Sequence, residues 1–199
     1  MEADEKPRPE GVKKSPEAEV AGEGPSEIWV PDPRVKLPDA AEWAAAHVHA
    51  RAEKAMARCF HSWQVPFYLP LIRRARYQRG RKVEAFVPLF AGYIFFDRAA
   101  VERQQVLETN KVAKILEAPD PERLRGELSS LAIALGADVA LKEYRFGEPG
   151  SRVLVVRGPL RGVEGILVRY QGKDRLILQI QMIGRAVLAD VEIDMCEPL

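Results

Sequence analysis

Residues 87–97 read VPLFAGYIFFD, and this stretch decides how the first half of the chain is interpreted. Its second part, residues 93–97, is apolar up to a closing aspartate, which is typical of a buried strand. Its first part is a turn, because Gly92 supplies backbone freedom at a bend. Phe90 and Tyr93 stand on either side of that glycine. Such rings either pack on their own sheet or are presented to a partner, and both alternatives are open at this point.

The flanking segments predict an α+β domain, an antiparallel sheet flanked by helices. Apolar residues at helical spacing predict one helix over 50–63 and another over 120–135. The second has Asp120 as a candidate N-cap and Pro121 at its first position. A third helix is expected over 98–109. Strands are expected over 65–72, 93–97 and 111–118, whereas residues 40–49 are compatible with a strand or a helix.

Residues 73–90 predict a β-hairpin with Gly80 at its tip. Between Leu71 and Val83 the segment is basic and contains no acidic residue; its cations are Arg73, Arg74, Arg76, Arg79, Arg81 and Lys82. An extended positive ribbon can lie along nucleic-acid phosphates, which makes these six residues candidates for nucleic-acid binding. A solvated hairpin that charge keeps soluble is the alternative.

Beyond Gly136 the pattern changes to short alternating strands separated by glycine turns. Strands are expected over 151–157, 163–170, 174–183 and 185–191. Short strands at this spacing indicate a small β-barrel, a fold that leaves few open sheet edges. We therefore expect four parts: a proline-rich disordered tail (1–38), the α+β domain (39–136), a linker (137–146) and a small barrel (147–199).

Bulk properties exclude several classes of protein. The net charge of the 199 residues is +1, so charge as a whole predicts no nucleic-acid or membrane partner. Cys59 and Cys196 are too few for a disulfide framework, which favours a reducing cytoplasm. No apolar run approaches the roughly 20 residues that span a membrane, and the first residues lack the apolar segment of a secretory signal. We expect a cytoplasmic monomer.

No pattern of catalytic or metal-binding residues emerges. His47 and His49 are two residues apart, and Cys59 and His61 share a predicted helix at a spacing that points them in different directions. The glycine-rich stretch 158–165 lacks the Lys-Ser/Thr pair of a phosphate-binding loop. We predict no enzyme activity, no cofactor and no metal site.

Two regions resemble one known family. Residues 43–60, WAAAHVHARAEKAMARCF, resemble the opening of the NusG N-terminal domain, in which a Trp starts the first strand and an Arg and a Glu-Lys pair open the first helix. The residues at those positions are Trp43, Arg51, Glu53 and Lys54. Residues 67–97 are similar to the strand, basic hairpin and Pro-Leu-Phe-Pro-Gly-Tyr signature that follow. Residues 150–170 look like a KOW motif, and residues 182–199 are similar to the segment that closes it.

The resemblance implies a bacterial transcription elongation factor without catalysis. Its N-terminal domain would bind RNA polymerase and modulate pausing, termination and antitermination, and its SH3-like KOW barrel would recruit Rho or a small-subunit ribosomal protein. The implied polymerase-binding candidates are Trp43, Ala44, Phe90, Gly92 and Tyr93. A second class of function is also open, namely an RNA- or ribosome-binding module that uses the basic hairpin and the barrel.

The candidate KOW contacts lie on two turns and are Leu160, Arg161, Ile183 and Arg185. Leu160 is expected either exposed at its turn tip or capping its own barrel. Three residues depart from the family pattern: Ala91 replaces a proline, Ala44 a tyrosine and Leu160 a frequent phenylalanine. These departures suggest a specialised paralogue of the RfaH type.

Overall fold

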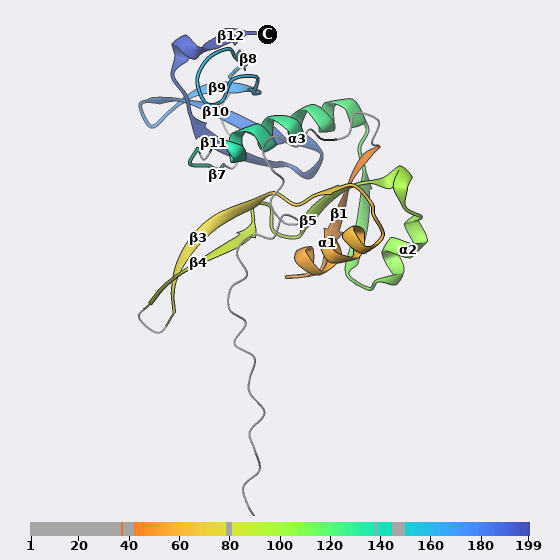
Figure 1. The fold of residues 1–199 in the computed structure, drawn as a ribbon. Helices are drawn as coiled ribbons and strands as arrows, with labels where there is room; N and C mark the ends of the chain where they lie inside the picture. The colour runs from red at the N-terminus through yellow and green to blue at the C-terminus, as the bar shows by residue number, and fades with distance from the viewer. Residues whose placement is uncertain (1–36, 38–41, 79–80, 138, 145–149) are drawn as a thin grey trace, which may run out of the picture.

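The computed structural model describes residues 37, 42–78, 81–137, 139–144 and 150–199 (Figure 1). The predicted tail therefore lies outside the described residues, except for Leu37, which is buried in the main core. The predicted hairpin tip at Gly80 also lies outside them. The described chain combines helices with antiparallel sheets, which confirms the predicted α+β class.

The first sheet has four strands in the order β2-β5-β1-β6. Its strands are β1 (Trp43–Val48), β2 (Phe67–Tyr68), β5 (Tyr93–Asp97) and β6 (Val112–Glu117). The ambiguous segment before residue 50 is thus a strand, β1, which pairs antiparallel with β5 on one side and β6 on the other. It reads as a nearly continuous apolar run because layers cover both faces of this central strand.

Helices cover both faces of this sheet. Helices α1 (Glu53–Ser62) and α2 (Arg103–Glu108) pack with Ile94 and Phe96 on one face, and α3 (Pro121–Gly136) packs with Phe95 on the other. The alternation along β5 therefore divides its aromatic residues between two cores. The strand predicted over 93–97 is confirmed, and both of its faces are buried.

Several predicted elements have different bounds. The strand expected over 174–183 is wrong in its last part, because it ends at Ile180 and a 3-10 turn, η2 (Gln181–Ile183), follows. The helix expected over 98–109 is wrong in its first part, where a 3-10 turn, η1 (Arg98–Ala100), precedes extended Val101, and α2 begins only at Arg103. The strand expected over 65–72 is divided, because Pro66 and Pro70 lack the N–H that a ladder requires. Its two parts are β2 and the beginning of β3.

Strands β3 (Leu71–Gln78) and β4 (Arg81–Pro88) form a separate two-stranded ribbon. Their antiparallel register runs from Leu71 opposite Pro88 to Gln78 opposite Arg81. The ribbon extends away from the rest of the molecule (Figure 1). Both faces of its outer part are therefore open to a partner.

The C-terminal part is a six-stranded antiparallel sheet in the order β12-β8-β9-β10-β11-β7. Its strands are β7 (Lys142–Tyr144), β8 (Ser151–Val155), β9 (Glu164–Tyr170), β10 (Lys173–Ile180), β11 (Arg185–Asp190) and β12 (Cys196–Pro198). Buried residues such as Val155, Leu176 and Val187 fill its interior. The sheet-rich C-terminal region is as predicted, and β7 lies within the segment interpreted as a linker.

Helix α3 lies between the two sheets (Figure 1). It contacts β1 of the first sheet and β9 and β10 of the second, and its leucines belong to a buried cluster that is continuous through both. Its start is as predicted, since the Asp120 carboxylate accepts a hydrogen bond from Arg123 N at 2.9 Å.

Two side chains of α3 also bond to the second sheet. Ser130 Oγ accepts from Glu164 N at 3.2 Å, and Glu127 Oε2 accepts from Gln181 N at 3.0 Å. Burial raises the pKa of the Glu127 carboxyl despite these donors and the neighbouring Arg123. The helix is therefore a structural part of both halves of the chain.

Candidate partner-binding surfaces

The turn between β4 and β5 is fixed by backbone hydrogen bonds. Leu89 N donates to Pro70 O at 2.8 Å, Tyr93 N to Phe90 O at 3.1 Å, and Val48 N to Gly92 O at 2.8 Å. Gly92 has a φ of +85°, a conformation that favours glycine. The turn is thus anchored to both neighbouring segments and presents its side chains in one defined arrangement.

The carboxylate of Glu53 completes this turn. Glu53 is the first residue of α1, and its Oε1 accepts from Gly92 N at 2.7 Å. The side chain is buried, and the helix N-terminus favours its negative charge. Sequence reasoning placed Glu53 only in the family pattern and found no partner for it, because a bond between residues 53 and 92 becomes visible only once the chain has folded.

Replacing Glu53 with alanine should lower the free energy of unfolding by about 1–3 kcal/mol, because it leaves the N–H of Gly92 without a partner. Glu53→Gln keeps an acceptor oxygen and should cost less. Urea unfolding followed by tryptophan fluorescence measures both. Glu102→Ala is the matched control, since Glu102 precedes α2 and its side chain makes no capping bond. Equal, small effects of Glu53→Ala and Glu102→Ala would contradict this role for Glu53.

Tyr93 and His47 form an aromatic pair at the edge of the turn. They face each other in the β1–β5 register, and their rings stack with centroids 5.0 Å apart and an interplanar angle of 29°. Tyr93 is half-buried and His47 is exposed. A Cβ at Gly92 would lie 3.5 Å from the His47 ring, so this backbone approaches the pair closely. Among the predicted turn residues, Tyr93 therefore has the ring that a partner can reach.

The other polymerase-binding candidates lie in the interior. Trp43, Ala44 and Phe90 are 1%, 0% and 3% exposed. Trp43 and Ala44 belong to different cores on opposite faces of β1, so they do not share a surface. The structure thus brings Gly92 and Tyr93 to the surface of the turn and leaves the remaining three in the interior of the domain.

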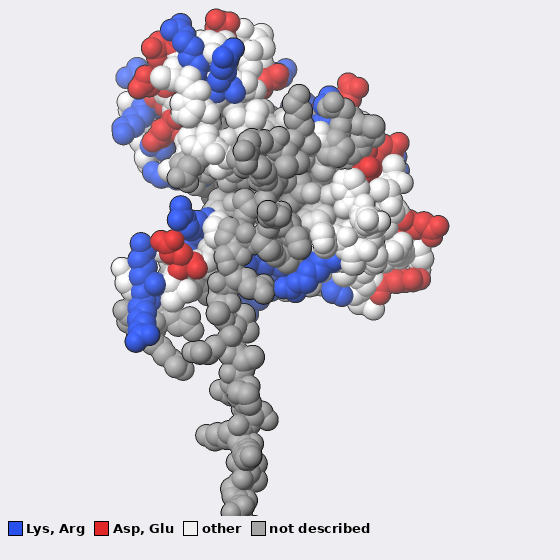
Figure 2. Space-filling model, in the orientation of Figure 1, with Lys and Arg blue, Asp and Glu red and all other residues white. Residues whose placement is uncertain are grey.

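The basic hairpin presents its cations unevenly. Arg73, Arg74, Arg81 and Lys82 are exposed, whereas Arg79 and the side chain of Arg76 lie outside the described residues. Glu84 forms ion pairs at 3.5 Å with both Arg73 and Lys82. The register places Arg74 opposite Ala85, on the other face from Glu84. Figure 2 shows the basic side chains along the ribbon, with the acidic group beside them.

Sequence reasoning missed Tyr77 on this ribbon. Its side chain is 79% exposed and lies opposite Lys82 in the register. A tyrosine flanked by basic residues would have been the signal, because aromatic rings among cations are typical of surfaces that stack bases.

The C-terminal candidates fall into two environments. Leu160 is 2% exposed, so it is buried rather than presented at its turn tip, and Arg161 beside it is exposed. Ile183 is half-buried in the 3-10 turn η2 (Gln181–Ile183), and Arg185 is exposed just after it. The first N–H of η2 is the one that donates to Glu127 of α3.

Comparison with known proteins gives a family for one segment of the chain. The model of the family described as "NusG: Transcription termination factor nusG" matches residues 41–130. Residues 41–130 are a NusG-family domain. This domain contains β1, α1, the basic hairpin, the Gly92 turn and the first part of α3.

Comparisons with curated proteins and with solved structures give no further support for a family or a fold. No curated protein matches the sequence. Among solved structures, the chain is similar to one titled "Crystal Structure of MjSpt4:Spt5 complex conformation A", with 14% identity over 79% of this chain and 97% of that one. The TM-score of 0.23 is too low to support an argument about the fold.

The described residues contain neither a metal-binding cluster nor a membrane-spanning helix. No group of three or more His, Cys, Asp or Glu side chains within the described ranges is arranged to hold a metal ion. No helix in the same ranges is long and apolar enough to cross a membrane. The features that remain are surfaces: the aromatic pair, the basic ribbon and the C-terminal sheet.

Proposed function

We propose that this protein is a cytoplasmic, monomeric and non-catalytic transcription elongation factor. Its NusG-family domain binds RNA polymerase and modulates pausing, termination and antitermination. The observation that carries this proposal is the family match over residues 41–130. Within that domain the geometry of the Gly92 turn supports a contact surface rather than a reaction centre.

The Tyr93–His47 pair is the proposed centre of the polymerase contact. The turn is held by hydrogen bonds from three segments, so its rings lose little conformational freedom on binding. A tyrosine offers an apolar face and a polar hydroxyl, and such aromatic anchors dominate many interfaces. Phe90, Trp43 and Ala44 lie in the interior and are not part of this proposed contact.

Tyr93→Ala should weaken binding to core RNA polymerase by about 2 kcal/mol, or roughly 30-fold, because it removes an anchor at the centre of the contact. Calorimetric titration of the purified full chain measures the affinity. Tyr170→Ala is the matched control, since Tyr170 is also half-buried and contacts the Tyr144 ring at 5.8 Å, but lies in the C-terminal sheet. Unchanged affinity for Tyr93→Ala would refute the assignment of this surface.

The proposed domain organisation assigns the second partner to the C-terminal sheet. The first domain in this proposal spans residues 39–136, and a KOW domain spans residues 147–199. The KOW domain would recruit Rho or a small-subunit ribosomal protein. Arg161, Ile183 and Arg185 supply the contacts of this proposed surface, and Leu160 supports it from the interior. Arg161 and Arg185 are exposed and Ile183 is half-buried, whereas Leu160 is buried, which favours this division of roles.

A nucleic-acid-binding module is the second candidate function. The observation that favours it is the projecting ribbon on which Arg74 and Arg81 are exposed away from Glu84. Phosphate contacts from such residues position a nucleic acid without reading its sequence. This function is compatible with polymerase binding, since both surfaces lie in the same domain.

The double variant Arg74→Ala/Arg81→Ala should flatten the salt dependence of RNA affinity. Each lost phosphate contact lowers the slope of log K against log salt by about 0.7 for a single strand, so two contacts lower it by roughly 1.4. Fluorescence anisotropy with a labelled single-stranded RNA measures the slope. Arg98→Ala is the control, since Arg98 is paired with Glu42 at 2.7 Å outside the ribbon. A slope that the double variant leaves unchanged would exclude the ribbon as an RNA contact.

A further inference from the structure

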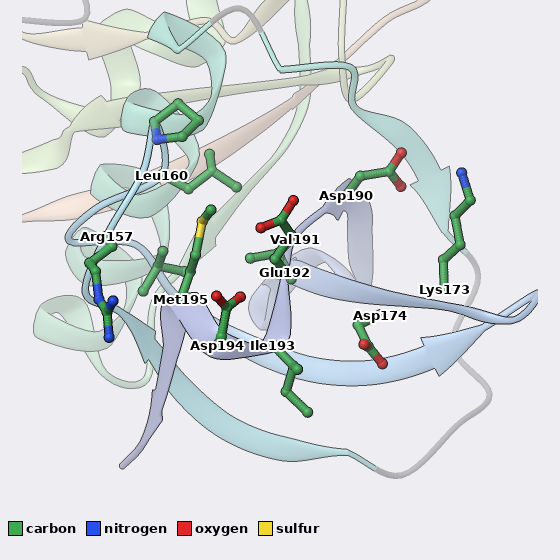
Figure 3. Close-up of a pocket in the computed structure, with 12 residues that line it drawn as sticks. Arg157, Leu160, Lys173, Asp174, Asp190, Val191, Glu192, Ile193, Asp194 and Met195 are labelled. Atoms are coloured by element: carbon green, nitrogen blue, oxygen red, sulfur yellow. The ribbon is translucent and has the colours of Figure 1, made fainter.

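The C-terminal sheet has an open pocket of about 700 Å³ at one end. The loop after β8, the start of β10 and the segment after β11 form its walls (Figure 3). The pocket lies entirely within residues 155–195, apart from the Gly92 turn and the basic ribbon. None of the surfaces described above accounts for it, although Leu160 contributes to its lining.

The floor of this pocket is apolar. Val155 and Leu160 are 1% and 2% exposed there, and Met195 and Val191 are half-buried beside them. Gly158 makes room for the floor, because a Cβ at its position would lie 2.8 Å from Met195 Sδ. A methionine in such a place adapts its shape to a guest side chain.

The rim carries an apolar side chain that has no cover in the described structure. Ile193 lines the pocket and is 59% exposed, one of few large hydrophobic residues in the described ranges with such exposure. It belongs to the 3-10 turn η3 (Ile193–Met195), whose position is fixed by a bond from Val156 N to Met195 O at 2.9 Å. An exposed isoleucine beside an apolar floor is a surface that association would bury.

Carboxylates surround this apolar surface. Four acidic residues line the pocket against two basic ones, Arg157 and Lys173; the acids are Asp174, Asp190, Glu192 and Asp194. Asp190 forms an ion pair with Arg175 at 3.3 Å. Within the described residues, no ion pair with a lysine or arginine involves Asp174, Glu192 or Asp194.

The negative charges act on a common region. Burial raises the pKa of the Cys196 thiol, and the charges of Asp194 and Asp174, which come from two different segments, raise it further. Carboxylates therefore outnumber cations among the residues that line this end of the sheet. An excess of negative charge favours basic groups over phosphates.

We propose that this pocket binds a basic segment of a protein partner, with one large apolar side chain inserted against Leu160, Met195 and Ile193. Lysine or arginine residues on either side of that side chain then face Asp174, Glu192 and Asp194. The proposal rests on the proposed function, in which the C-terminal sheet recruits a second protein, and it adds the chemical character of the segment that this protein would offer. Nucleic acids and anionic membranes do not have this complementarity.

Three peptides test the proposal on the ¹⁵N-labelled full chain. The probe is acetyl-Gly-Lys-Lys-Leu-Lys-Lys-Gly-amide; the others replace leucine with serine, or all lysines with glutamates. The leucine–lysine peptide is expected to shift the amide signals of Arg157, Gly158, Leu160 and residues 190–195. The proposal is overturned if the serine or the glutamate peptide binds equally well, if the shifts lie elsewhere, or if a single-stranded RNA shifts the same signals.

Variants separate the apolar from the electrostatic contribution. Ile193→Ser should weaken the leucine–lysine peptide by about fivefold, since it removes part of the apolar contact. Asp174→Asn/Asp194→Asn should weaken it and reduce its salt dependence. Glu164→Gln is the matched control, because Glu164 is an exposed carboxylate of the same sheet that lines a different pocket and should leave binding unchanged. Equal losses in the control and the double variant would overturn the proposal.

The same proteins distinguish this inference from the proposed function. Ile193→Ser should bind core polymerase like the unmodified chain, and Tyr93→Ala should bind the peptide like the unmodified chain. Failure of the unmodified chain to bind the leucine–lysine peptide, with its polymerase binding intact, would overturn only the pocket. Unchanged polymerase binding by Tyr93→Ala, with peptide binding intact, would overturn only the polymerase surface.

Discussion

Phe90→Ala is expected to destabilise the NusG-family domain by about 3–5 kcal/mol, the usual cost of truncating a buried phenylalanine. Phe90 is 3% exposed and belongs to the core cluster that joins the first sheet to α3. Its truncation leaves a cavity that the surrounding turn cannot fill, because hydrogen bonds to Pro70 and Val48 hold that turn in place. The loss should therefore lie near the upper end of this range.

Tryptophan fluorescence during urea unfolding reports this effect selectively. All three tryptophans, Trp29, Trp43 and Trp63, precede the C-terminal sheet in the sequence. Trp43 is buried in the same cluster as Phe90, so its emission follows that core. Phe90→Leu, which keeps much of the volume, should cost clearly less. A loss below 1 kcal/mol together with lost polymerase binding would mean that Phe90 is a surface anchor instead.

Leu160→Ala is expected to destabilise the C-terminal sheet by about 2–5 kcal/mol. Leu160 is 2% exposed, shares a cluster with Val155 and Val163, and forms the floor of the acidic-rimmed pocket. A partner-binding defect in this variant would thus reflect a damaged sheet as well as a lost contact. This is why the tests of the pocket use Ile193 and leave Leu160 unchanged.

Hydrogen exchange of the amides of β8 and β10 measures the stability of this sheet, which contains no tryptophan. Arg161→Ala is the matched control, since Arg161 is the next residue, is exposed, and should change stability by less than about 0.5 kcal/mol. If Leu160→Ala costs no more than Arg161→Ala, the leucine is not part of the core.

The elements that the sequence predicted well are those with a strong local signal. β5 follows from an apolar run, and the start of α3 follows from Asp120 and Pro121, because an N-cap acts within one turn. The short strands of the C-terminal sheet follow from alternation between glycine turns. In each case the residues that decide the structure are neighbours along the chain.

The candidate sites depended on contacts that are distant in sequence. Phe90 belongs to a buried cluster that includes leucines of α3, more than 30 residues later, and the role of Glu53 depends on Gly92. No periodicity records such a contact, so Phe90 and Tyr93 were both candidates for the contact surface, although Phe90 lies inside and Tyr93 lies half-buried at the turn. The pocket around Ile193 was missed for the same reason, since its walls come from three separate segments.

Helix α3 has a consequence for how the chain can be divided. The family match ends at residue 130, midway along a helix whose leucines are buried between two sheets. A fragment that ends there cuts the helix, and one that ends at Gly136 keeps it but uncovers the side that faced β9 and β10. Either fragment would expose apolar surface and tend to self-associate. The natural unit for purification is thus larger than the family domain, and substitutions on α3 must suit two neighbours at once.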